Sequence, residues 1–147
     1  MSKGAVASAA VDAVKIYGSG ATEVRALDGL SVGFEGGAFT AIMGPSGSGK
    51  STLLHCLAAL DRVTGGRIEL DGEDVSALDE RQLTMRRRDK VGFIFQAFNL
   101  VPTLTALENI TLPMALAGRD HDPAWLDTIV DTVGIRPRLG HRPAELS

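Results

Sequence analysis

The residues between positions 44 and 51 have the types and the spacing needed to hold phosphate groups. They read Gly-Pro-Ser-Gly-Ser-Gly-Lys-Ser, which fits the pattern G-x-x-x-x-G-K-[S/T]. In such a loop successive backbone N–H groups point into one concavity, a helix begins directly behind them, and a lysine adds positive charge. This stretch therefore predicts a site for the phosphates of a nucleotide.

Each residue type in the loop has a physical role. Gly44, Gly47 and Gly49 permit positive φ and let the backbone approach phosphate oxygens without a Cβ in the way. We expect Lys50 to bring its ammonium to the β- and γ-phosphates and Ser51 to ligate a Mg²⁺ ion that bridges them. The predicted nucleotide-binding residues of the loop are Gly44, Ser46, Gly47, Ser48, Gly49, Lys50, Ser51 and Thr52, of which Thr52 has a mainly structural role.

The elements around the loop have the order that this motif requires. The apolar run at 39–43 predicts a strand that enters the loop, and the pattern at 52–60 predicts a helix that leaves it. Further predicted strands lie at 11–17, 24–27, 30–34, 67–70 and 91–95, with an Asp71-Gly72 hairpin turn after the fourth of these. Predicted helices lie at 79–88, at 106–110 with continuation or restart at 113–117, and at 123–133, ended by Gly134.

The composition is that of one soluble globular domain. The 147 residues are 44% hydrophobic and 22% charged, and the net charge of -3 argues against a general nucleic-acid binder. No apolar run approaches the length of a membrane span, and the Ala/Val-rich start at 5–14 is too short and broken for a signal peptide. Any membrane role is therefore expected to come from a partner.

Several other features favour ordinary structural roles. The basic run at 86–90 has no interleaved aromatic residues, so it predicts a solvated helix face and not a nucleic-acid site. The single cysteine, Cys56, lies on the apolar side of the predicted helix after the loop, where we expect it to pack in a reduced setting. His55, His121 and His141 have no metal-ligand spacing.

Gln96 directly follows the predicted strand at 91–95. Its side-chain carbonyl could ligate Mg²⁺ and position an attacking water. The alternative is that this amide satisfies backbone groups of its own loop. The residues by themselves leave both interpretations open.

Taken together, these motifs resemble the nucleotide-binding domain of ATP-binding cassette (ABC) transporters. The matching features are Tyr17, the loop at 44–51, the turn at 70–72, Phe95-Gln96 at the position of the family's Q-loop, and the final residues at 145–147. The amino-acid sequences at 41–54 and 95–110 are similar to those of the lipoprotein-release and macrolide-export branch of that family. The resemblance runs from about residue 11 to the last residue.

The resemblance implies roles for two residues outside the loop. It implies that Tyr17 stacks on adenine, although packing of this side chain in the core is the alternative. It also implies that Gln96 ligates Mg²⁺ and positions water in the complete domain. ATP and Mg²⁺ are the implied cofactors.

The resemblance further implies an α/β fold: a P-loop NTPase, with an incomplete ABC-type ATPase core, an antiparallel β part and the start of a helical subdomain. We expect the ATP-binding core at 1–105 and the helical subdomain from 106 to 147, ending inside the family's signature motif. The implied partners are a transmembrane permease and a second ATP-binding domain in a homodimer, with no nucleic acid. The implied location is cytoplasmic, on the inner membrane through the permease.

One part of the family's catalytic machinery has no match in the sequence. No run of four apolar residues is followed by Asp-Glu, and the nearest match, at 68–71, reads as a hairpin strand. The family uses these two carboxylates to hold the Mg²⁺ shell and to activate water. We therefore expect this chain to bind ATP without hydrolysing it, as part of an ATPase. The alternative is a non-hydrolytic nucleotide-binding module or scaffold. We also expect the chain to leave apolar surface uncovered. A small-molecule kinase is disfavoured, because in such kinases the loop commonly lies near the N-terminus.

Overall fold

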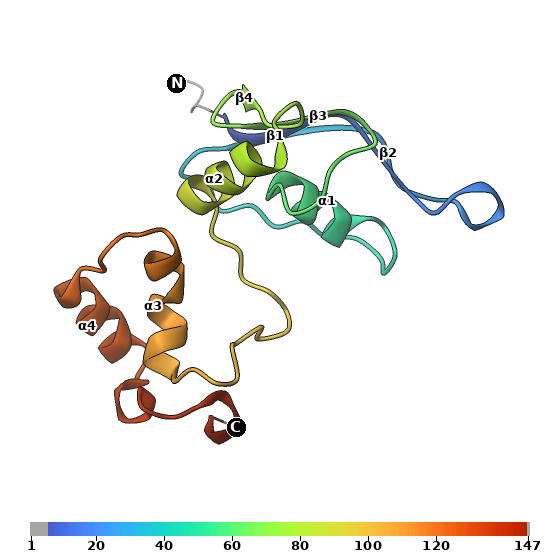
Figure 1. The fold of residues 1–147 in the computed structure, drawn as a ribbon. Helices are drawn as coiled ribbons and strands as arrows, with labels where there is room; N and C mark the ends of the chain where they lie inside the picture. Colours follow the sequence, from blue (N-terminus) through green and yellow to red (C-terminus); the bar gives the residue numbers. More distant parts are fainter. Residues whose placement is uncertain (1–5, 147) are drawn as a thin grey trace. The chain divides into compact units, whose positions relative to one another are not determined.

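An antiparallel sheet of four strands forms the framework of the first part of the chain (Figure 1). The computed structural model describes residues 6–146, which form two compact units that divide after Phe93. In the first unit the strand order is β2-β1-β3-β4, and every neighbouring pair is antiparallel. The strands are β1 (Val6–Tyr17), β2 (Val24–Glu35), β3 (Gly65–Leu70) and β4 (Glu73–Asp74).

The predicted strands at 24–27 and 30–34 are one continuous strand, so the expected break between them is wrong. Leu27 pairs with Lys15 and Leu30 pairs with Ala13, so β2 carries one extra residue opposite β1. This is a β-bulge, and Gly29 takes it up at a φ of +67°. A glycine that reads as a turn in the sequence is here a bulge inside a long strand.

The predicted turn at 71–72 and the predicted helix at 79–88 are confirmed. The hairpin between β3 and β4 turns at Asp71 and Gly72, which both have positive φ, as the favoured two-residue turn requires. Helix α2 (Glu80–Lys90) begins with a capping box between Asp79 and Gln82. Basic residues of the run at 86–90 pair with neighbours, for example Arg86 with Glu73 and Lys90 with Asp71.

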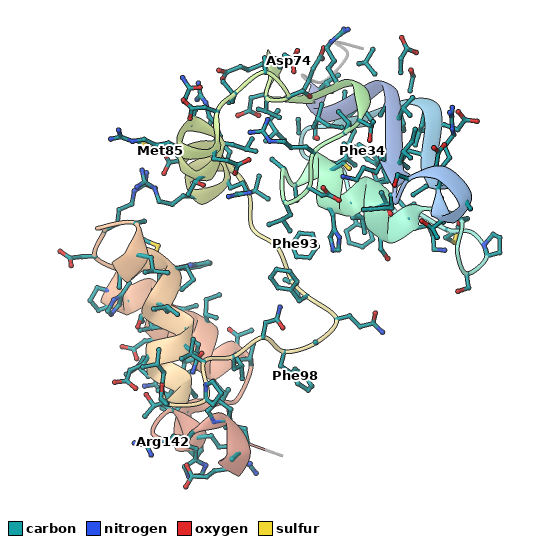
Figure 2. All side chains as sticks on the ribbon, turned by 45° about the vertical axis from the view of Figure 1, so that its right-hand side comes forward. Phe34, Asp74, Met85, Phe93, Phe98 and Arg142 are labelled. Atoms are coloured by element: carbon teal, nitrogen blue, oxygen red, sulfur yellow. The ribbon has the colours of Figure 1, made fainter. Side chains whose placement is uncertain are left out.

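Two predicted strands, at 39–43 and 91–95, are wrong as strands in this structure. Both segments run without strand pairing, and Phe39 and Met43 are 100% and 87% exposed. Among residues 6–146 no strand lies alongside either segment to share backbone hydrogen bonds, and a strand exists only as part of such a ladder. Figure 2 shows side chains such as Phe93 and Phe98 along the chain that follows α2, and the Phe98 side chain is 90% exposed.

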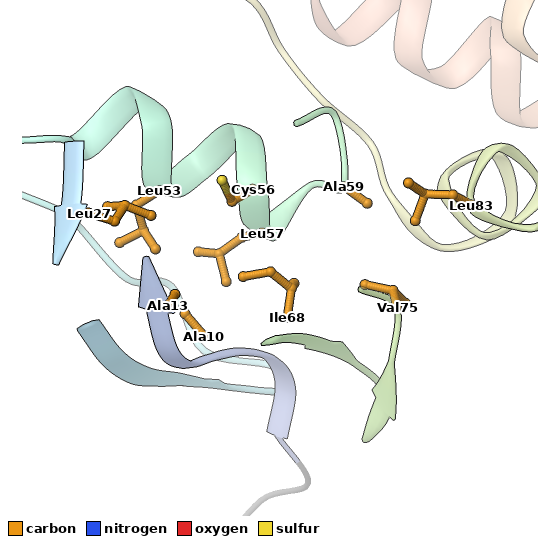
Figure 3. Close-up of a cluster of buried hydrophobic side chains, with 10 residues drawn as sticks. All are labelled: Ala10, Ala13, Leu27, Leu53, Cys56, Leu57, Ala59, Ile68, Val75 and Leu83. Carbon is orange, nitrogen blue, oxygen red and sulfur yellow. The ribbon is translucent and has the colours of Figure 1, made fainter. Parts of the chain in front are cut away.

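The core of the first unit lies between the sheet and helices α1 (Lys50–Leu57) and α2 (Figure 3). It consists of Ala10, Ala13, Leu27, Leu53, Cys56, Leu57, Ala59, Ile68, Val75 and Leu83. Cys56 is fully buried, which confirms its predicted packing role, and burial raises the pKa of its thiol. The core holds α1 through its buried side chains Leu53, Cys56 and Leu57. The N-terminus of the helix, where the loop ends, therefore has a defined position on the sheet.

The second unit, residues 94–146, contains helices α3 (Ala106–Leu116) and α4 (Pro123–Thr132) and two short 3-10 turns, Arg136–Arg138 and Pro143–Glu145. Thr105 and Glu108 form a capping box at the start of α3, and Gly134 lies at a φ of +69° just beyond α4, as predicted. Helix α3 continues through Pro113. The predicted division of the chain between 105 and 106 remains a prediction, and Ser147 lies outside the described residues.

The junction between the loop and α1 depends on Gly49. This residue is the N-cap of α1, lies at a φ of +83°, and packs so closely on β2 that a Cβ would sit 2.4 Å from the carbonyl oxygen of Ala26. Gly47, two residues earlier, has a similar φ of +79° but nothing within 4 Å of an added Cβ. The two glycines share the same backbone conformation and differ in their surroundings.

We predict that Gly49→Ala destabilises the protein more than Gly47→Ala does. Both substitutions place a side chain in the left-handed region, at a cost of about 1 kcal/mol, but only the Gly49 variant also pushes against a β2 carbonyl. Denaturant unfolding should therefore give a loss of roughly 2–3 kcal/mol for Gly49→Ala and about 1 kcal/mol for Gly47→Ala. Equal losses for the two variants would show that the contact with Ala26 is unimportant.

Candidate nucleotide-binding site

All of the predicted phosphate-binding residues except Gly44 line one hollow at the start of α1. This hollow has a volume of about 280 Å³ and lies between residues 24–26 of β2 and residues 46–52 of the loop and helix. Gly44 borders a neighbouring groove and lies at a φ of +156°. The positive φ values predicted for Gly44, Gly47 and Gly49 are confirmed.

The first turn of α1 leaves backbone donors at the hollow. The amide of Leu53 donates to the carbonyl of Gly49 at 2.8 Å and closes this turn. Gly49 has no side chain to cap the amides ahead of Leu53, and those N–H groups have no intrahelical acceptor. With the positive end of the helix dipole behind them, they suit an anion.

Lys50 folds back over its own loop. Its ammonium donates to the carbonyl oxygen of Pro45 at 2.6 Å and to the hydroxyl of Ser48 at 3.3 Å. These two acceptors are neutral, and a phosphate oxygen in the hollow is a stronger acceptor for the same ammonium. Lys50 is therefore already held at the rim of the loop, next to the backbone donors.

Tyr17 stands at the end of β1, beside the start of α1. Its hydroxyl donates to Asp61 at 2.7 Å, and Tyr17 as a residue is 41% exposed and is not a member of the buried core. The hydrogen bond to Asp61 raises the pKa of the Tyr17 phenol, partial burial adds to this rise, and a hydrogen bond with Thr52 opposes it. Thr52 belongs to α1, so Tyr17 adjoins the phosphate loop. Stacking of its ring on adenine remains a prediction.

Lys15 and Asp61 were not singled out from the sequence, although both contact Tyr17. The Lys15 ammonium lies 2.6 Å from a carboxylate oxygen of Asp61 and 4.8 Å from the centre of the Tyr17 ring. Burial alone would raise the pKa of the Asp61 carboxyl, but hydrogen bonds from Lys15 and Tyr17 outweigh it and hold that pKa below its usual value. Lys15 could have been noticed, because it lies two positions before Tyr17 on the same strand face. Asp61 gives no comparable signal.

The predicted magnesium ligands, Ser51 and Gln96, lie in different units of the chain. Ser51 is in the first turn of α1, next to Lys50, whereas Gln96 belongs to the second unit. That Ser51 and Gln96 share one Mg²⁺ ion remains a prediction, because they belong to different units. Within residues 6–146 no group of three or more His, Cys, Asp or Glu side chains could hold a metal ion. Neutral hydroxyl and amide oxygens fit a Mg²⁺ ion that arrives on a nucleotide's phosphates and keeps several waters.

Comparisons of the sequence with known proteins point to one family. The family model for the ABC transporter matches residues 27–147. An uncharacterised ABC transporter ATP-binding protein of Thermotoga maritima is 48% identical over 93% of this chain, which spans 59% of that protein. The lipoprotein-releasing system ATP-binding protein LolD of Geobacter metallireducens is 42% identical over 93% of this chain, which spans 62% of that protein. The macrolide export ATP-binding/permease protein MacB of Hyphomonas neptunium is 46% identical over 92% of this chain, which spans 21% of that protein.

The fold of this chain also matches solved structures of an ATP-binding cassette. The dimeric, post-hydrolysis structure of the ATP-binding cassette MJ0796 bound to ADP and Pi matches with a TM-score of 0.82 and 36% identity, over 95% of this chain and 63% of that one. The predicted α/β fold of the ABC ATPase class is thereby confirmed, and so is the predicted resemblance to relatives of the MacB and LolD kind. This chain belongs to the ABC transporter ATP-binding family.

Proposed function

We propose that this chain is the ATP-binding part of an ABC transporter ATPase that, in its complete form, hydrolyses MgATP to power a membrane partner. The observation that carries the proposal is the joint placement of Lys50 and the uncapped amides of α1 around one hollow. This arrangement presents a full positive charge and several backbone donors to the same volume, which suits a triphosphate.

We propose that three groups of residues bind the phosphates, the adenine and the Mg²⁺ ion of the nucleotide. Lys50 and the amides of residues 48–51 bind the phosphates, with the positive φ of Gly47 and Gly49 keeping the backbone open to them. Tyr17 stacks on the adenine from the end of β1. Ser51 and Gln96 would ligate Mg²⁺, which when bound neutralises charge on the β- and γ-phosphates. Gln96 would also position water in the complete domain.

The proposed partners follow from the named relatives. The MacB relative is by its name an ATP-binding and permease protein, and the MJ0796 cassette is a dimer. We propose that this chain likewise works with a transmembrane permease and with a second ATP-binding domain. Between residues 6 and 146 no helix is both long enough and apolar enough to cross a bilayer. Attachment to the cytoplasmic side of the inner membrane would then come through the permease.

We further propose that a polypeptide of these 147 residues binds ATP without turning it over. The sequence contains no Asp-Glu pair after four apolar residues, so the carboxylates that would hold the Mg²⁺ shell and activate water have no equivalent in it. Removal of a base and a metal carboxylate together reduces turnover by several orders of magnitude and leaves phosphate binding by backbone amides intact.

Replacement of the loop lysine tests the phosphate site. We expect Lys50→Ala to weaken ATP binding by about tenfold to a hundredfold, because a charge-assisted hydrogen bond to phosphate is lost. Lys90→Ala is the matched control, since Lys90 is half-exposed, pairs with Asp71 at 2.8 Å and does not line the hollow. Isothermal titration calorimetry measures both. Equal affinities for the two variants would contradict the assignment of the loop.

Phosphate release tests the absence of turnover. We expect the 147-residue polypeptide and its Lys50→Ala variant to release inorganic phosphate from MgATP at the same rate as buffer, because the general base is missing. The measurement is a continuous phosphate assay over hours at saturating ATP. A rate that depends on Lys50 would mean that other residues of this chain activate the water.

A further inference from the structure

The Tyr17 ring is held by a small charged cluster in the first unit. Its hydroxyl donates to one carboxylate oxygen of Asp61 at 2.7 Å, and the Lys15 ammonium donates to the other at 2.6 Å. The same ammonium donates to the carbonyl of Arg62 at 2.7 Å, and Asp61 accepts from the Arg62 amide at 2.8 Å. The carboxylate therefore joins the end of β1 to the segment that follows α1.

These contacts restrict how the ring can turn. The orientation of a tyrosine ring is set by two rotatable bonds, χ1 and χ2. A hydrogen bond at the hydroxyl, the atom farthest from the backbone, restricts rotation about both. The Lys15 side chain is only 12% exposed, and its ammonium lies 4.8 Å from the ring centre, so it supports the ring from one side. The remaining 41% exposure of Tyr17 leaves surface on which a flat ligand can stack.

We propose that Asp61, together with Lys15, is a positioning residue that holds the Tyr17 ring in the orientation that receives a purine base. This inference rests on the proposed stacking of Tyr17 on adenine and adds the residues that preorganise it. A ring that is fixed before the nucleotide arrives loses less side-chain freedom on binding, so the base binds more tightly. Asp61 acts through Tyr17 and does not itself contact the phosphates.

The test compares ATP with inorganic tripolyphosphate, which has the phosphates and no base. We expect Asp61→Asn and Tyr17→Phe each to weaken ATP binding roughly threefold to tenfold and to leave tripolyphosphate binding unchanged. Asp71→Asn is the matched control, because Asp71 pairs with exposed Lys90 elsewhere on the unit, and it should change neither affinity. The double variant Asp61→Asn/Tyr17→Phe should bind ATP about as well as the weaker single variant, because both changes break one contact.

A spectroscopic measurement reports the contact itself. Tyr17 is the only tyrosine of the chain, so the rise of phenolate absorbance with pH reports it alone. Because Asp61 raises the pKa of this phenol, Asp61→Asn should move the absorbance midpoint to lower pH. An unmoved midpoint overturns the inference, since the hydroxyl would then not be bonded to Asp61 in solution.

The remaining outcomes separate this inference from the proposed function. If Tyr17→Ala weakens ATP binding while Asp61→Asn and Tyr17→Phe do not, stacking stands and the positioning role fails. If Asp61→Asn weakens tripolyphosphate as much as ATP, the residue supports the loop or the fold and the inference is overturned. If Tyr17→Ala leaves ATP binding unchanged, the stacking itself is wrong and the inference falls with it.

Discussion

The approach of Gly49 to the Ala26 carbonyl is the constraint on which the nucleotide site depends. A Cβ at position 49 would lie 2.4 Å from that oxygen, so the start of α1 rests directly on β2. The same glycine, at positive φ and without a side chain, leaves the first amides of α1 without a cap. One residue thus both places the helix on the sheet and keeps its N-terminus open to an anion.

The Lys50 ammonium is held by two oxygen atoms of the loop itself. The ammonium bonds to Pro45 and Ser48, so it stays at the loop. A nucleotide must replace two hydrogen bonds to neutral oxygens with bonds to charged ones, and the exchange is favourable because charge-assisted bonds are about twice as strong. Holding the lysine in place beforehand reduces the side-chain entropy lost on binding.

Features encoded in short stretches could be predicted from the sequence, and features that depend on distant partners could not. The helical patterns at 79–88 and from 106 and the Asp71-Gly72 turn are local, so helices α2 and α3 and the β3-β4 hairpin were predicted, and the structure adds the capping boxes at 79–82 and 105–108 that start the two helices. Whether Gly29 breaks a strand or bulges within it depends on its pairing with β1, which no local pattern reveals. Likewise, Asp61 and Tyr17 meet across 44 positions, and only the fold brings them together.

The segment at 39–43, which enters the loop, has no strand partner among the described residues, and only Ile42 of its side chains packs against the core. Apolar grooves of about 480 and 370 Å³ border this segment, both within the first unit, and both are lined by Phe34, Thr40 and Ile42. Phe39 and Met43 are almost fully exposed, so the segment gains burial mainly through Ile42 and gains nothing from strand pairing. On this side the loop is therefore anchored through a single side chain, two residues before Gly44. On the other side, α1 fixes the phosphate-binding backbone more firmly, through its buried Leu53 and Cys56 and through the close approach of Gly49 to β2.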